Sequence, residues 1–276
     1  MATAPKVRPF SNAAEATHQY HADAYVLDAD LKQPVPSKID KTGLVTLPED
    51  GKYTYTPVKP FNLDGVLSYG DGYTQVAGHR SSKHHGFVTL ATAVLENINV
   101  LDVVTADRVV AQISTEHPED GQVPSVTFLG TRFVNLRIGG HKVDVDQDLH
   151  ILGPKPAKDK SYFETSAVID KMQQQYSNLR KTKNLPEWAD QQFRWNKAAA
   201  KNGTLNCSLV NKTTGAPGTP FGHVIDVPHF GKVFLGELTV TRDPAPSKDY
   251  NETYHFHLKM IRLEMGCIGL DRHSSA

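Results

Sequence analysis

The chain has little of the residue types that usually mark a chemical function. Its 276 residues include only two cysteines, Cys207 and Cys267, and these do not form a CxxC pair. A zinc knuckle and a thioredoxin-type redox site are therefore excluded, and two buried free thiols are expected. A disulfide between Cys207 and Cys267 is the alternative if the protein meets an oxidising compartment.

Neither sign of charge prevails, and no long apolar run occurs. Thirty Lys and Arg residues balance thirty Asp and Glu residues, which disfavours a nucleic-acid-binding domain led by phosphate contacts. No apolar run approaches the roughly 18 residues that a membrane-spanning helix needs. The N-terminal sequence MATAPKVRPFSNAAEATHQYHADAY also lacks the apolar core of a signal peptide. We therefore expect no nucleic-acid or membrane partner and a cytoplasmic location, with export or surface association as the alternative.

Motifs for nucleotide binding and nucleophilic catalysis are missing as well, because the sequence has no G-x-S-x-G, no P-loop and no G-x-G-x-x-G after a strand. Asp144, Asp146 and Asp148 alternate like the start of a calcium loop. Leu149 and Lys155, however, stand where an EF-hand needs glycine and glutamate. This segment is interpreted as a solvated acidic strand face.

Several acidic residues lie in or beside apolar strands, and their role stays open at this point. They are either acid–base pairs facing one cavity or partners in ion pairs with Arg108 or Arg132. The residues are Glu96, Asp107, Glu116 and Glu237.

Most of the chain has the composition of β-strands. Residues 86–114 are dense in Val, Ile and Thr, which favour a pleated, packed surface. They predict strands over 86–96 and 103–114, with a turn near 97–102. Gly139-Gly140 predicts a two-residue hairpin turn.

The segment 155–203 differs, since Gln, Lys, Ala, Glu and Trp replace the β-branched residues. Ser161 and Glu164 form a capping-box pattern, which predicts a helix over 162–180. A second helix is predicted to begin at Pro186, with an apolar stripe that includes Trp188, Trp195 and Ala199.

The predicted fold class is therefore mainly β, a sandwich or barrel-like arrangement of antiparallel sheets with a two-helix insertion. An N-terminal arm is expected over 1–21 and a flexible tail over 270–276. A single β-rich domain is expected over 22–269, interrupted by the helical insertion at 155–203.

Long stretches of the sequence resemble a group of uncharacterised bacterial β-rich proteins. The stretches are TLATAVLENINVLDVVTADRVVAQISTEHP, FLGTRFVNLRIGGHKVDV, FGHVIDVPHFGKVFLGELTV and HLKMIRLEMG. More distantly, the order V-x-x-L-x-V-L…VTAD, then L-x-I-x-G-x-x-V, is similar to secreted choice-of-anchor proteins. The resemblance implies a β-rich fold and implies neither an activity nor catalytic residues.

Thirteen histidines are a high number for this length and point to the one chemistry left to consider. His255 and His257, two apart on a predicted strand, share one face as a pair of metal ligands would. His223 or His229 is the expected third ligand of a transition-metal ion, because sequential strands usually lie side by side. An ordinary wet strand face explains the same four histidines without a metal.

Two hypotheses about function follow. The first is a non-enzymatic β-rich binding or assembly protein that self-associates, because β-rich chains leave an edge or a face to cover. The second is a metal-dependent enzyme or a small-ligand carrier that uses the histidines.

Overall fold

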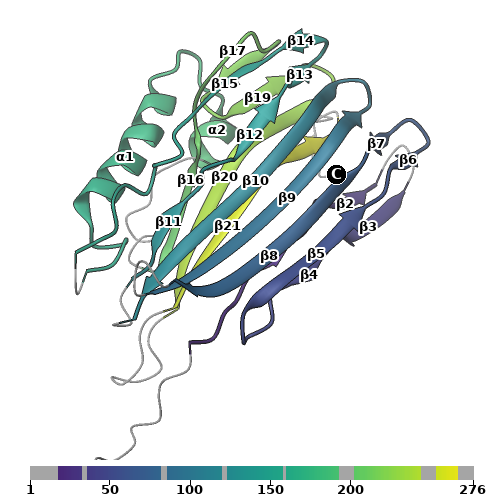
Figure 1. Cartoon of the computed structure of the whole chain (residues 1–276). Coiled ribbons are helices and arrows are strands. Elements are labelled where there is room, and N and C mark those ends of the chain that lie inside the picture. The colour runs from purple at the N-terminus through teal and green to yellow at the C-terminus, as the bar shows by residue number, and fades with distance from the viewer. Residues whose placement is uncertain are drawn as a thin grey trace, which may run out of the picture.

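The computed structural model describes residues 18–32, 36–81, 86–119, 123–157, 160–192, 202–243 and 253–266. These residues form several antiparallel sheets with two helices and no closed barrel (Figure 1). The predicted mainly β class is therefore confirmed. None of the described helices is long and apolar enough to cross a membrane.

The structure has two main sheets, and we call the larger one the large sheet. It contains ten described strands, which are arranged around one long hairpin. Its strands are β5 (Lys52–Val58), β6 (Phe61–Leu63), β7 (Leu67–Tyr69), β8 (Gly72–Ser81), β9 (Gly86–Val100), β10 (Val104–Pro118), β11 (Ser125–Thr127), β12 (Arg132–Val134), β13 (Arg137–Ile138) and β14 (His141–Lys142). The hairpin of β9 and β10 forms the centre of this sheet, and β8 and β5 continue it on one side.

The central hairpin is longer than the sequence predicted, since β9 and β10 have 15 residues each. The predicted turn over 97–102 was too wide. The reversal takes three residues, 101–103, of which Leu101 and Asp102 both have φ of 53°. The Asn99 side-chain oxygen accepts a hydrogen bond from the Asp102 amide at 2.9 Å, which stabilises a tight turn without glycine.

The second main sheet, here the small sheet, comes mostly from the C-terminal part of the chain. Its described strands are β16 (Thr204–Ser208), β18 (Thr219–Phe221), β19 (Val224–Val227), β20 (Gly231–Asp243) and β21 (Thr253–Met265). Three two-stranded sheets complete the β structure: β1 (Asp23–Ala24) with β4 (Val45–Thr46), β2 (Leu27–Leu31) with β3 (Ser37–Thr42), and β15 (Asp144–Gln147) with β17 (Val210–Thr214).

The glycine hairpin forms as predicted, because Gly139 and Gly140 have φ of 55° and 78° and connect β13 to β14. Only two residues pair on each side of the turn. The acidic segment that follows does not continue this hairpin, and pairs with β17 instead.

The two helices are α1 (Ser166–Arg180) and α2 (Glu187–Gln192). The predicted start of the first helix at 162 was too early. The amide and hydroxyl of Thr165 both donate to the Ser161 carbonyl, at 3.1 and 2.8 Å, and close a separate turn before α1. Trp195 and Ala199 of the second predicted helix lie outside the described residues.

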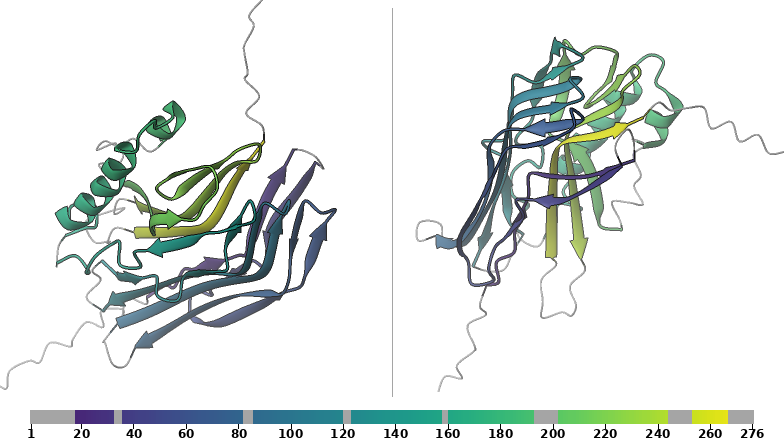
Figure 2. Two further views of the ribbon diagram at one scale, coloured as in Figure 1. Left: turned by 90° about the horizontal axis from the view of Figure 1, so that it is seen from above. Right: turned by 90° about the vertical axis from the view of Figure 1, so that its right-hand side faces the viewer.

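The two main sheets pack face to face in two layers (Figure 2). Their shared core combines Val104, Ala106 and Ile138 of the large sheet with Val233 and Leu235 of the small sheet. Strands from both sides of the helical segment therefore bury their apolar faces against each other. That 22–269 folds as one domain stays a prediction.

Two residues with left-handed backbones change the direction of side chains within the long strands. Asn97 in β9 has φ of 51°, and Leu95 and Ile98 on either side of it both pack into one cluster. Gly236 in β20 has φ of 62°, and Leu235 and Leu238 both turn inward. Each strand thus departs from strict alternation at one point.

Candidate functional site

The structure brings His255 and His257 together on one face of β21. His255 lies opposite Thr241 and His257 opposite Thr239, and both imidazoles are exposed. His255 Nε2 is 3.0 Å from Asp243 Oδ2. The predicted geometry of the pair is therefore present.

The other two predicted ligands lie elsewhere. The His223 carbonyl accepts a hydrogen bond from the Leu235 amide of β20. His223 is therefore about 10 Å from β21 across the sheet, because β20 lies between them. Along the strand direction it is a further distance of about 13 Å from His257. His229 is in the exposed turn before Gly231, about 26 Å along the strands from His257. Within the part of the chain that is described, no group of three or more His, Cys, Asp or Glu residues could hold a metal ion. A metal at the pair stays a prediction.

His223 is buried and lies near a network of charged side chains. Burial lowers its pKa to about 4, with Glu237 and Arg262 acting in opposite directions on it. At neutral pH this imidazole is therefore uncharged.

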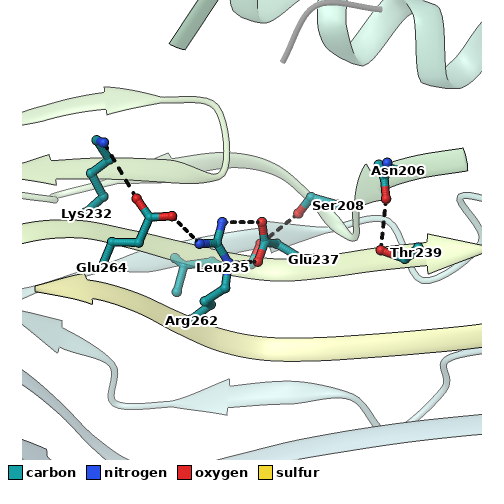
Figure 3. A network of polar contacts seen from close by, with 8 residues as sticks. All are labelled: Asn206, Ser208, Lys232, Leu235, Glu237, Thr239, Arg262 and Glu264. Carbon is teal, nitrogen blue, oxygen red and sulfur yellow. Dashed lines mark hydrogen bonds and ion pairs between the residues drawn. The ribbon is translucent and has the colours of Figure 1, made fainter. Parts of the chain in front are cut away.

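The network crosses β20 and β21 on the outer face of the small sheet (Figure 3). Arg262 donates two hydrogen bonds to the Glu237 carboxylate, at 2.6 and 2.9 Å, and also pairs with Glu264. Lys232 lies 3.6 Å from Glu264. The hydrogen bonds that Arg262 donates to Glu237 raise the pKa of Arg262. Glu237, one of the candidate acids, is thus engaged in an ion pair, as Glu96 is with Arg108.

The helices cover part of this outer face and one edge of the small sheet. Leu179, Trp188, Phe221 and Phe234 share a buried cluster. The Gln175 side chain donates to the Ser208 carbonyl at 2.8 Å and accepts from the Ser208 amide at 3.1 Å, which pairs the free edge of β16. Little of this region is open to a ligand.

The outer face of the large sheet is different. We define the tyrosine face as the outward side chains of β5, β8, β9, β10 and β12. Cross-strand register places them on one side. They include Tyr53, Tyr55, Tyr73, Gln75, Ala77, His79, Val88, Leu90, Thr92, Val94, Glu96, Arg108, Val110, Gln112, Ser114, Glu116 and Arg132.

Two tyrosines stand out on this face. Tyr53 is 61% exposed and Tyr55 47% exposed, among the most exposed large hydrophobic side chains of the described chain. The Tyr55 ring stacks on Tyr73 with centroids 5.6 Å apart. The Tyr53 hydroxyl donates to the Gln75 side chain at 3.3 Å. These contacts hold the rings in place without burying them.

The charged side chains named above are two glutamates and two arginines, and none of them is a lysine. No described helix or strand covers it, and in Figure 1 the face is turned toward the viewer. The same open side is seen edge-on in Figure 2. The sequence predicted strands in this region, but no pattern in it indicated which face of the sheet would be exposed to solvent.

The fold and its faces define a mainly β protein of two packed antiparallel sheets, one of which is open on its outer side. A family model described as a domain of unknown function (DUF8256) matches residues 18–241, and the chain belongs to this family. No curated protein and no solved structure matches the chain.

Proposed function

We propose that this is a non-enzymatic binding or assembly protein that associates with a second copy of itself through the tyrosine face. The observation that carries the proposal is the exposure of Tyr53 and Tyr55 on a sheet face that no described element covers. A sheet that buries one face and exposes aromatic rings on the other presents an apolar surface that a partner can cover.

The composition of the face favours a protein partner. Tyrosine and arginine are enriched at protein interfaces, and lysine is depleted there. The presence of both glutamates and arginines favours a second copy over a strongly charged partner, because charges of opposite sign can pair between two such faces. A symmetric dimer is the commonest assembly of this kind.

The strand edges are less suited to assembly. Pro57 lies in β5, the strand that pairs with β8 alone among the described residues, and proline is typical of protected edges. The β21 strand presents charged side chains, including Lys259, Arg262 and Glu264. Pairing of two chains edge to edge is therefore disfavoured.

The state of the reactive side chains supports a non-enzymatic role. Burial raises the pKa of Cys207 to about 12, so the thiol is not a nucleophile at neutral pH. The likeness to uncharacterised bacterial β-rich proteins supports the same proposal and a bacterial origin.

Sedimentation or light scattering tests self-association. At tens of micromolar we expect the mass of a dimer for the unmodified chain and at least about tenfold weaker association for Tyr55→Lys. Leu44→Lys is the matched control, because Leu44 is 47% exposed, like Tyr55, and lies off the tyrosine face. A monomer mass for the unmodified chain, or equal weakening by both variants, would contradict the proposal.

A further inference from the structure

Two histidines that are far apart in the sequence meet at one end of the central hairpin. His117, near the end of β10, lies opposite Phe87 of β9. The His18 ring, from the N-terminal segment, stacks on the Phe87 ring with centroids 4.2 Å apart and planes 6° from parallel. Tyr20 packs its ring edgewise against His18 at 4.7 Å. The His18 ring is therefore held from two sides.

The separation of the two imidazoles suits a shared metal ion. Their ring centroids are 5.4 Å apart. A metal at its usual 2.0–2.1 Å from a ring nitrogen lies about 3.2 Å from the ring centroid. Two rings bound to one ion at a roughly tetrahedral angle therefore have centroids about 5.2 Å apart. The observed centroid spacing is therefore close to that of two imidazoles bound to one ion.

The ring nitrogens are also available. Both histidines are half-buried, and neither imidazole forms a hydrogen bond or an ion pair within the described residues. Burial lowers the pKa of His18 and brings that of His117 to about 4, so both rings are in the neutral form that binds metals.

We propose that His18 and His117 form a two-imidazole site for a divalent transition metal, with water in the remaining positions. Imidazole nitrogen suits copper, nickel and zinc, and copper(II) binds such ligands most tightly. A bound ion would tie the N-terminal segment to the end of β10. This proposal is independent of self-association through the tyrosine face, because His18 and Phe87 lie on the inner side of the sheet.

Lys155 provides a second test of the location. The positive charge of Lys155 lowers the pKa of His117, and the same charge repels a metal cation bound to that imidazole. Lys155 is exposed, so its replacement should not disturb the fold.

Copper(II) titration of the tag-free full chain, followed by calorimetry and electron paramagnetic resonance, tests the site. We expect His18→Phe and His117→Phe each to remove one copper equivalent, while the aromatic ring preserves packing. His141→Phe, at an exposed lone histidine of β14, is the control and should keep the full stoichiometry. Unchanged stoichiometry and affinity in both ligand variants would overturn the proposal.

Lys155→Gln should strengthen copper binding about threefold at low ionic strength, with the gain lost in high salt. This variant keeps both ligands, and so it tests the site even if the ligand variants fold poorly. No change in affinity at low salt would place the copper elsewhere.

Discussion

The outer faces of the two sheets differ in how far other parts of the chain cover them. On the small sheet, helices cover Phe234, and Arg262, Glu237, Glu264 and Lys232 form a continuous network of ion pairs. On the large sheet, the rings of Tyr53 and Tyr55 stay in solvent. The helices cover apolar side chains on the outer face of the small sheet, and no described element covers the tyrosines of the large sheet. This difference points to the large sheet as the surface for a partner.

The largest effect is expected when one sheet is removed. A fragment of residues 1–153 contains the whole large sheet and lacks the small one, whose residues complete the shared core. Because the inner face of the large sheet then lacks the small sheet as its packing partner, the fragment should not fold. Circular dichroism and thermal unfolding measure this. A cooperative melt of the fragment would show that the large sheet is independent.

Truncating one aromatic ring on each face compares the two directly. Phe234 is fully buried beneath the Arg262 guanidinium, which lies 3.6 Å from the ring centroid. Phe234→Ala should lower the free energy of unfolding by about 3–5 kcal/mol. Tyr55→Ala, in dilute protein, should cost less than about 1 kcal/mol. Urea denaturation measures both, and equal losses would mean that Tyr55 supports the fold rather than a partner.

Acid should weaken the covered side through His223. The pKa of His223 falls from 6.5 to about 4 on burial, so protons bind the unfolded chain more readily. The contribution of neutral His223 to the free energy of unfolding is therefore fully present above about pH 6.5 and is lost as the pH falls toward 4. The loss from this group is about 3 kcal/mol at most. His223→Gln should flatten part of that slope, and His117, whose pKa burial also lowers to about 4, contributes in the same direction.

The smallest effect is expected at the exposed histidine pair. Without metal, His255→Ala and His257→Ala should each change stability by less than about 0.5 kcal/mol, because both side chains are exposed. Thermal melts with and without zinc test the sequence-based hypothesis of a metal there. A zinc-dependent rise in Tm that both variants remove would establish the pair as ligands, and its absence would leave a wet strand face.

Local patterns in the sequence predicted the two long strands of the central hairpin and the glycine turn after β13. Gly139-Gly140 folds as the turn chemistry requires. Ile169, Met172 and Leu179 recur at helical spacing and form the buried side of α1. Predictions failed where a side chain replaced the usual signal, as Asn99 does beside the tight turn of the central hairpin.

The sequence by itself determined the mainly β class, the Gly139-Gly140 turn and the acidic strand, because period, turn residues and strand propensity act over a few neighbouring residues. Only the tertiary structure decided which side of β5 and β8 stays open, and that Arg262 pairs with Glu237. It also decided that His18 meets His117. These contacts join segments far apart in the chain, and the packing of the two sheets, rather than any local preference, sets which residues come together.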